Sequence, residues 1–242
     1  MESGAQKDIL GLIPARGGSK SIPLKNIVDL HGIPLMSYVI NAGKGSKSVT
    51  RLVCSTDSKE IAGLCEKQGV EVMARPIELA QDHTHVVEVV IDVLSKLKSR
   101  EGYVPFAVVL LQPTSPFVLP GHIDRCIEML RQDQNAGSVQ TITKFPHNYH
   151  AFNQRVINGN KVHFVFREER RQCYNKQKKP IFHCFGNIVV TRTQEIMEKK
   201  EIFAEPSLGL EIPFHYALDV DGPEDLEIAE WYLQKGKVII SH

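Results

Sequence analysis

Short apolar runs alternate with amphipathic stretches along most of this chain. The apolar runs predict buried strands at residues 9–14, 51–55, 70–73, 105–112 and 137–142. The run at 105–112 is almost continuously apolar, as is typical of a central parallel strand that is covered on both faces. Helical spacing of apolar positions occurs at residues 34–42, 59–68, 83–97 and 121–132. This alternation predicts βαβ units and an α/β fold with a doubly wound, mostly parallel, Rossmann-like sheet.

The pattern changes after about residue 144. Two short apolar segments, 152–156 and 161–166, flank Asn158-Gly159, which is a strong hairpin signal. A strand is expected at 182–191 and a helix at 193–200, and a last helix at 224–234 has Pro223 near its first turn. We therefore expect a single domain over residues 1–242 with a small β-rich region inserted at 144–192, which would supply substrate and subunit contacts.

The composition excludes some classes of protein and partner but does not itself indicate a function. The chain has 242 residues, 42% of them hydrophobic, which suits one domain with a sizeable core. The net charge of +1 gives no general attraction to nucleic acid or to a membrane surface. The five cysteines have no Cys-x-x-Cys spacing, and the sequence contains no apolar run of signal-peptide or membrane-spanning type. These features predict reduced, mostly buried thiols in a cytoplasmic protein.

The first strand leads into a loop rich in glycine and positive charge. Gly17 and Gly18 stand together, and Arg16, Lys20 and Lys25 have no acidic neighbour between residues 9 and 28. Glycines allow close approach of a ligand to the backbone, and exposed N–H groups beside cations attract phosphate. The spacing is neither that of a P-loop nor Gly-x-Gly-x-x-Gly. From these residues alone, a polyphosphate cradle and an ordinary basic loop remain equally open.

The second notable feature is an acidic segment near the end of the chain. Residues 219–230 carry six acids and no Lys or Arg. Asp219 and Asp221 alternate by two, so on a strand both carboxylates would project from one face. Paired carboxylates bind Mg²⁺, which prefers oxygen ligands and bridges phosphates. A solvated strand end or a helix cap is the alternative for such a pair.

Five motifs in order resemble one family. They are Ile13-Pro-Ala-Arg-Gly-Gly-Ser-Lys20 with Pro23-Leu-Lys-Asn26, then Ser55-Thr-Asp57, Arg75-Pro76 with Ala80-Gln-Asp82, Leu111-Gln-Pro-Thr-Ser-Pro116, and Leu218-Asp-Val-Asp221 with Asp225. Together they are similar to the acylneuraminate cytidylyltransferases, the CMP-sialic acid synthetase family. The resemblance implies a fold of the nucleotide-diphospho-sugar transferase type and a homodimer.

The resemblance also implies residue roles. Catalytic roles fall on Arg16, Lys20 and Asp221, and Mg²⁺ ligation falls on Asp219 and Asp221. Nucleotide binding falls on Ala15, Arg16, Gly17, Gly18, Ser19, Lys20, Lys25, Asn26 and Arg75. The resemblance assigns Gln112 to the sugar, and Thr114 and Ser115 beside it offer further neutral hydrogen bonds to a polyhydroxylated sugar acid. His150, in Pro146-His-Asn-Tyr-His150, is a candidate for sugar contact, with a plain surface role as the alternative. The resemblance also extends sugar binding to Lys176 and Gln177. The last two belong to a less exact match, in which Lys replaces the family's Arg and Gly186-Asn187 reverses its Asn-Gly.

The implied reaction joins CTP to a 2-keto sugar acid of eight or nine carbons. The anomeric hydroxyl would attack the α-phosphorus and release pyrophosphate, with Asp221 or a metal-bound oxygen taking the proton. A ketodeoxyoctonate cytidylyltransferase, another sugar nucleotidyltransferase and a non-catalytic nucleotide-binding protein are the alternatives. All of these readings require that the cations near residue 20 and the acids near residue 220 meet around one triphosphate.

Overall fold

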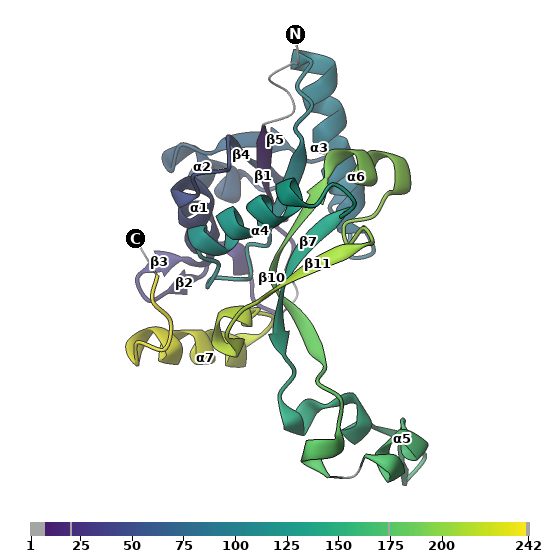
Figure 1. The fold of residues 1–242 in the computed structure, drawn as a ribbon. Helices are drawn as coiled ribbons and strands as arrows, with labels where there is room; N and C mark the ends of the chain where they lie inside the picture. Colours follow the sequence, from purple (N-terminus) through teal and green to yellow (C-terminus); the bar gives the residue numbers. More distant parts are fainter. Residues whose placement is uncertain (1–7, 20, 174, 241–242) are drawn as a thin grey trace.

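A seven-stranded mixed sheet forms the centre of the molecule (Figure 1). The computed structural model describes residues 8–19, 21–173 and 175–240. The strands are β1 (Ile9–Pro14), β4 (Arg51–Thr56), β5 (Glu71–Ala74), β6 (Ala107–Leu111), β7 (Ser138–Lys144), β10 (His183–Arg192) and β11 (Ser207–Glu211). They are arranged in the order β11-β7-β10-β6-β1-β4-β5. The pairs are parallel except that β10 runs antiparallel to both of its neighbours.

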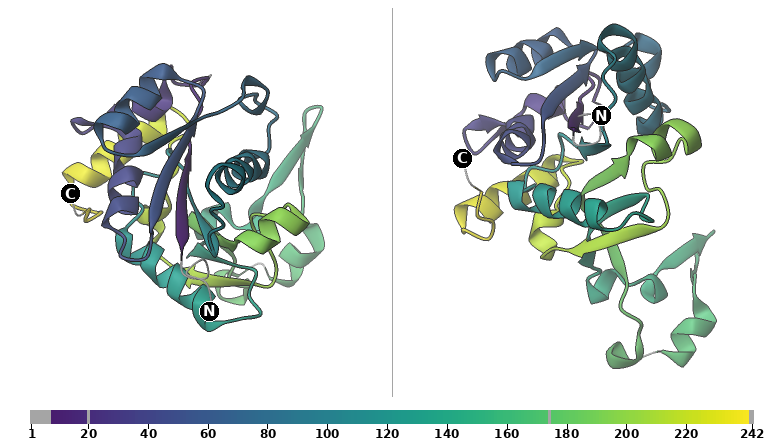
Figure 2. Two further views of the ribbon diagram at one scale, coloured as in Figure 1. Left: turned by 90° about the horizontal axis from the view of Figure 1, so that it is seen from above. Right: turned by 45° about the horizontal axis from the view of Figure 1, so that its top comes forward.

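Helices cover both faces of this sheet, as Figure 2 shows from two directions. One face packs against α1 (Leu35–Gly45), α2 (Lys59–Lys67) and α4 (Pro120–Gln132). The other face packs against α3 (Val86–Glu101) and α6 (Thr193–Lys199). Within β1, Ile9 and Ile13 belong to the first core and Leu10 and Leu12 to the second. A strand buried on both faces has no polar side to show, which explains its continuous apolar run.

A third, smaller core joins the beginning and the end of the chain. It lies between α7 (Pro223–Gln234) and a short hairpin formed by β2 (Asp29–Leu30) and β3 (Ile33–Pro34). Val220, just before α7, is fully buried in this core. Leu30 and Tyr38 reach it from the other side, and the Tyr38 hydroxyl donates to the Leu30 carbonyl at 2.9 Å. This packing brings residues near 220 next to the loop that follows β1.

Residues between β7 and β10 leave the sheet and form a separate lobe (Figure 1). It contains the hairpin β8 (Arg155–Asn158) and β9 (Lys161–Phe164), the helix α5 (Arg167–Gln172), and the 3-10 helices η4 (His147–Tyr149), η5 (Ala151–Asn153) and η6 (Lys176–Lys178). Gly159, with φ of 61°, turns the hairpin at the position the sequence indicated. The lobe is therefore a mixture of a hairpin and short helices rather than mainly β structure.

Most of the expected elements are confirmed, with shifted ends. The helix expected at 83–97 begins later, at Val86, and continues to Glu101, where Gly102 takes the left-handed conformation with φ of 67°. The strand expected at 152–156 begins at Arg155, because residues 151–153 form η5. The sequence analysis missed β11, whose side chains are only partly buried and which contains Gly209, and the two-residue strands β2 and β3.

The strand directions gather several loops at one edge of the sheet. β1, β4, β5, β6, β7 and β11 all run the same way, so their carboxyl ends share that edge. The chain moves outward from β1 through β4 to β5 and then returns to β6 on the other side of β1. Such a switch in strand order opens a crevice between the loops that follow the two strands, and ligands bind there in open α/β sheets.

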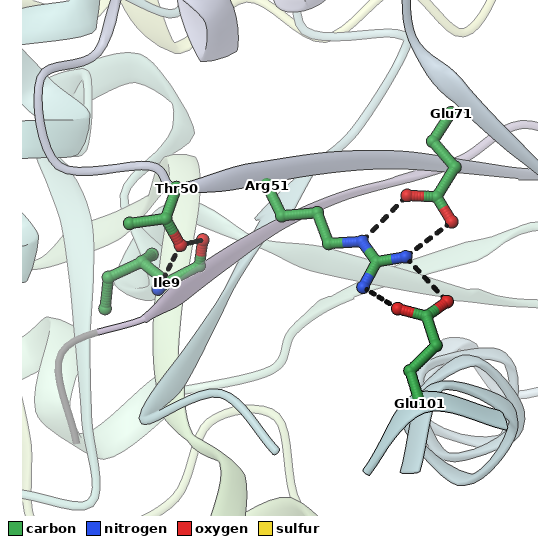
Figure 3. Close-up of polar contacts among 5 residues, drawn as sticks. All are labelled: Ile9, Thr50, Arg51, Glu71 and Glu101. Atoms are coloured by element: carbon green, nitrogen blue, oxygen red, sulfur yellow. Dashed lines mark hydrogen bonds and ion pairs between the residues drawn. The ribbon is translucent and has the colours of Figure 1, made fainter. Parts of the chain in front are cut away.

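The opposite edge carries an ion-pair cluster (Figure 3). Arg51, the first residue of β4, donates to Glu71 at 2.7 and 2.8 Å and to Glu101 at 2.7 and 3.0 Å. Beside it, the Thr50 hydroxyl bonds to the backbone of Ile9. The cluster joins the amino ends of β4 and β5 to the end of α3.

Two further expectations concern the thiols and the membrane. Cys54, Cys65 and Cys126 are buried, Cys173 and Cys184 are half-buried, and all five are free. Within the described residues, no helix combines the length and the apolar character needed to cross a membrane.

Candidate active site

An open cavity of about 520 Å³ lies at the carboxyl edge of the sheet, in the crevice between β1 and β6. Residues from four separate parts of the chain line it, at 14–26, 75–89, 112–114 and 219–221. Those that the sequence analysis assigned are Arg16, Gly18, Ser19, Lys25, Asn26, Arg75, Gln112, Thr114, Asp219 and Asp221. The early cations and the late acids therefore meet in one cavity, although about 200 residues separate Ser21 from Asp221.

The loop after β1 is held by polar contacts with its surroundings. The Gly17 amide donates to Asp57 at 2.9 Å, and the Asn26 side chain donates to the Arg16 carbonyl at 2.9 Å. A β-carbon at Gly17 would lie 2.9 Å from the β-carbon of Ser58, so only glycine fits against the start of α2. A β-carbon at Gly18 would meet nothing within 4 Å. Gly18 thus leaves open backbone beside the cavity.

The cations of this loop are paired with acids from distant segments. Arg16 Nη1 lies 2.6 Å from Asp82 Oδ1, and Lys25 Nζ lies 3.3 Å from Asp221 Oδ1. The Lys25 side chain is only 13% exposed, whereas that of Asp221 is 82% exposed. Exposed ion pairs of this kind are weak, so phosphate oxygens can compete with either acid for its cation. Lys20 lies outside the described residues.

Arg75 is a buried cation on the cavity wall. It is 8% exposed, and its guanidinium donates to the Ser55 carbonyl at 2.7 Å and to the Ser55 hydroxyl at 3.3 Å. Burial lowers the pKa of the Arg75 guanidinium, and the nearby Asp57 carboxylate offsets this only in part. A desolvated cation that faces a cavity gains stability from an anionic or polar ligand.

The acidic segment is extended but is not part of a strand, which corrects the sequence interpretation. Among the described residues its one bond between backbone groups runs from the Val220 amide to the Thr114 carbonyl at 2.8 Å, and burial of the Val220 side chain and bonds with the Ser21 and Asp225 side chains also hold it. The alternation still works: Val220 points into the third core, and Asp219 and Asp221 line the cavity. Asp225 accepts from the amides of Asp221 and Gly222, so it caps α7.

Asp219 and Asp221 form a donor set that suits a hard cation shared with a ligand. Among the described residues, no group of three or more His, Cys, Asp or Glu side chains gathers as a protein-only metal site. Mg²⁺ does not require one, because it is commonly held by one or two carboxylates together with substrate phosphates. The two carboxylates and the open cavity between them and Arg16 therefore fit such an ion.

The loop after β6 combines one buried and two accessible polar residues. Gln112 and Thr114 line the cavity, whereas Ser115 is 1% exposed. Its hydroxyl donates to Asp219 Oδ1 at 3.2 Å. Ser115 thus lies behind Asp219 and orients its carboxylate.

The remaining sugar-binding candidates lie in the lobe, away from the cavity wall. His150 is buried, stacks on Phe182 with ring centroids 4.7 Å apart, and bonds to the Pro180 carbonyl at 3.0 Å. Gln177 is exposed in η6. Lys176 begins the same 3-10 helix, and its side chain is outside the described part of the chain.

Several cavity residues were not assigned from the sequence. Leu79, Gln81, Asp82 and Thr84 come from the segment between β5 and α3, and Ser21 donates to the Asp221 carbonyl. Ala80-Gln-Asp82 was recognised as a motif, but nothing in its residue types indicates that Asp82 pairs with Arg16. The Ala80-Gln-Asp82 motif was the one sequence feature that pointed to the segment between β5 and α3 as part of the site.

Comparison with known proteins identifies relatives over nearly the whole chain. The family model described as cytidylyltransferase matches residues 10–212. CMP-N,N'-diacetyllegionaminic acid synthase of Legionella pneumophila is 33% identical over 226 residues, covering 92% of this chain and 94% of the relative. N-acylneuraminate cytidylyltransferase of Escherichia coli O18:K1:H7 is 29% identical over 94% of this chain, which spans about half (52%) of that protein.

A solved structure shares the architecture. CMP:2-keto-3-deoxy-manno-octonic acid synthetase complexed with CTP superimposes with a TM-score of 0.73 at 15% identity, over 95% of this chain and 99% of the other. At this identity the similarity concerns the fold.

Proposed function

The chain belongs to the cytidylyltransferase family, and from that premise we propose that it transfers CMP from CTP to the anomeric hydroxyl of a sialic-acid-like nonulosonic acid, releasing pyrophosphate. The relatives named for legionaminic and acylneuraminic acids support this substrate class. The observation that carries the proposal is the meeting of Arg16, Lys25, Asp219 and Asp221 in one cavity at the strand switch point. A nucleotidyl transfer needs this combination of cations for phosphates and acids for a metal.

The loop after β1 would hold the triphosphate. Arg16 can grip two phosphate oxygens at once, and Lys25 supplies a half-enclosed positive charge beside it. The open backbone at Gly18 allows close approach of the phosphates. When CTP binds, we expect phosphate oxygens to replace Asp82 on Arg16 and Asp221 on Lys25. The same cations then neutralise the charge that develops on the leaving pyrophosphate, which lowers the barrier. Lys20 is proposed to join them.

The opposite wall would hold the sugar acid. Gln112 and Thr114 offer neutral hydrogen bonds to hydroxyl groups, and the loop that carries them is bonded to the acidic segment. This arrangement would hold the anomeric hydroxyl near Asp221, whose exposed carboxylate is the available proton acceptor. Correct placement of the hydroxyl in line with the α-phosphorus supplies much of the acceleration.

We propose that Asp219 and Asp221 hold Mg²⁺ together with the phosphates. Ser115 fixes the Asp219 carboxylate through its hydroxyl, and Asp221 becomes available to the ion once phosphate oxygens have replaced it on Lys25. The bound ion would neutralise phosphate charge and orient the α-phosphate. We place the protein in the cytoplasm, in keeping with its free cysteines.

We further propose that two copies pair through the lobe. Among its described side chains, from 145 to 173 and from 175 to 182, only His150 is fully buried. Ile157 and Val162, which are 75% and 59% exposed, are cross-strand partners and project from one face of the hairpin. Val156, which is 51% exposed, projects from the other face. An isolated two-stranded hairpin is marginal in water, and exposed apolar side chains gathered together indicate a protein contact. A second copy of the lobe presents the same apolar surface.

Pyrophosphate release tests the proposed reaction. The purified enzyme is incubated with CTP, UTP or GTP and with keto acids of eight and nine carbons, including sialic acid, its deaminated analogue, and legionaminic, pseudaminic and ketodeoxyoctonic acids. We expect release only with CTP and a nine-carbon acid. Turnover restricted to ketodeoxyoctonic acid would favour the eight-carbon alternative. Nucleotide binding without turnover of any acid would contradict the proposed reaction.

A further inference from the structure

Asn187 is a completely buried polar side chain at an irregularity in β10. The pairing of β10 with β7 shifts between Phe185 and Val189, so a bulge interrupts the ladder there. Thr141 of β7 lies opposite, and its hydroxyl accepts from the amides of Asn187 at 2.8 Å and Ile188 at 3.0 Å. The hydroxyl thus satisfies two backbone donors that the bulge releases from the ladder.

Gly186 allows this close approach. A β-carbon there would lie 2.5 Å from the Thr141 hydroxyl oxygen and 2.8 Å from the Thr141 β-carbon. These distances exclude any larger residue unless β7 moves. Gly186 and Thr141 therefore fix the position of the next residue, Asn187, within the sheet.

The Asn187 side chain connects the sheet to two segments that lead into the cavity, loop 112–117 and segment 214–221. Its Nδ2 donates to the Tyr216 carbonyl at 2.8 Å and, at the longer distance of 3.4 Å, to the Phe117 carbonyl. Tyr216 lies in η7 (Phe214–Ala217), which leads directly into Asp219. Phe117 ends the loop that begins at Gln112. The Asn187 Oδ1 is held by the Thr141 hydroxyl at 3.0 Å, so the amide orientation is defined.

Loop 112–117 and segment 214–221 are also bonded directly to each other. The Val220 amide bonds to the Thr114 carbonyl at 2.8 Å, and the Ser115 hydroxyl bonds to Asp219 at 3.2 Å. Loop 112–117 and segment 214–221 are thus one bonded unit, attached to the sheet through Asn187. The phosphate loop at residues 15–26 meets this unit at Asp221, through the Ser21 hydroxyl and the Lys25 ammonium, and is otherwise held by Asp57 and by Asn26.

We propose that Asn187 is a positioning residue for the transfer reaction: by holding the carbonyls of Phe117 and Tyr216 it sets the placement of Gln112 relative to Asp219 and Asp221. This inference rests on the proposed function for its kinetic part. Loss of the side chain should disturb the sugar and metal side of the cavity more than the phosphate loop, whose bonds to Asp57 and from Asn26 do not depend on Asn187. Misplacement by about 1 Å can lower a rate by about 100-fold.

The test compares Asn187→Ala with Val93→Ala, a buried control in α3 that does not line the cavity. For Asn187→Ala we expect kcat to fall by about 10- to 100-fold and the KM for the sugar acid to rise, while the affinity for CTP without metal changes less than about twofold. For Val93→Ala we expect a similar loss of melting temperature with unchanged kinetic constants. Asn187→Ser, which keeps one shorter donor, should fall between Asn187→Ala and wild type.

A readout that does not depend on turnover separates this inference from the proposed function. Hydrogen exchange of the amides in 112–118 and 214–221 should accelerate in Asn187→Ala and not in Val93→Ala. An inactive wild-type enzyme would defeat the proposed function, while the exchange result would still stand. Unchanged kcat in a folded Asn187→Ala or Asn187→Ser variant, or loss of CTP affinity in proportion to kcat, would overturn the positioning role. Unchanged exchange in both segments would do the same.

Discussion

Arg16 and Lys25, the described cations of the loop after β1, already have acidic partners from elsewhere in the chain. Asp82 holds Arg16 and Asp221 holds Lys25, across gaps of 66 and 196 residues. These partners neutralise the loop when no nucleotide is bound and keep the long side chains extended toward the cavity. The cost of removing them is small, because exposed ion pairs contribute at most about 1 kcal/mol. In the proposed complex, phosphate oxygens would take the places that the Asp82 and Asp221 carboxylates occupy here.

Asp221→Asn should abolish most of the activity while the protein stays folded. The amide keeps the shape of the side chain but loses the charge that a metal ion and a proton require, so we expect kcat to fall by at least about 100-fold. The side chain is 82% exposed, so the melting temperature should stay near that of wild type. Steady-state pyrophosphate release and a thermal melt check this. Glu227→Gln, an exposed acid of the same region, is the matched control and should be fully active.

Asp82→Asn should strengthen the binding of CTP in the absence of metal. The substitution frees Arg16 from its 2.6 Å ion pair, and an exposed pair of this kind corresponds to about a two- to fivefold change in affinity. Titration calorimetry at low ionic strength checks this, and the gain should shrink as salt is added. Weaker binding by the variant would mean that Asp82 itself contacts the nucleotide.

At the level of elements, the site depends on which ends of the strands face the cavity. The apolar runs were enough to predict the central strands and the helices between them, because burial on both faces leaves an unmistakable pattern. They could not predict β11 or the hairpin of β2 and β3, whose strands are short or half-exposed. The alternation of Asp219 and Asp221 suits a strand, but among the described residues this segment has one backbone bond to its neighbour and no ladder. Alternation alone does not distinguish these two cases.

Arg51 should stabilise the opposite edge of the sheet in a pH-dependent way. Its hydrogen bonds lower the pKa of Glu101 below the usual 4.5, so the contribution is complete above pH 4.5 and is lost as the pH falls through the lowered value. In Arg51→Met we expect a melting temperature a few degrees lower at pH 7 and a difference from wild type that shrinks toward pH 3. Thermal melts between pH 3 and 7 check this. A difference independent of pH would assign the effect to packing against Tyr103, whose ring centroid lies 4.9 Å from the guanidinium carbon.

At the scale of the whole molecule, the lobe is the candidate contact between copies, because it projects from the body and most of its described side chains are exposed (Figure 1). If two copies pair through it, Ile157→Asp should produce monomers, since Ile157 is 75% exposed and a charge there would be buried in the contact. Light scattering coupled to gel filtration gives the mass directly. Ile239→Asp, at a position that is 78% exposed outside the lobe, is the control and should leave the mass unchanged. A monomeric wild-type protein would contradict the proposal.

The sequence predicted the phosphate-binding and metal-binding candidates of the cavity better than it predicted the residues proposed to hold or position the sugar. Motifs placed after β1, β5 and β6 converge because parallel strands end at one edge, and this follows from fold logic alone. The roles of Ser115 and Asn187 could not be predicted, because both bond to residues that are distant in the sequence and neither lines the cavity. His150 and Gln177 lie in the lobe, where residue types alone give no direction toward a cavity.

The chain enters the lobe from β7 and returns through β10, which is the antiparallel neighbour of β7 in the sheet. The residues at which the chain leaves and rejoins the sheet, Lys144 and His183, are therefore paired neighbours, as at the two ends of an ordinary hairpin. A module attached in this way can be shortened, enlarged or exchanged between homologues without any change in how the remaining strands are threaded. Replacement of residues 146–181 by a tight turn should thus leave an intact sheet and phosphate loop.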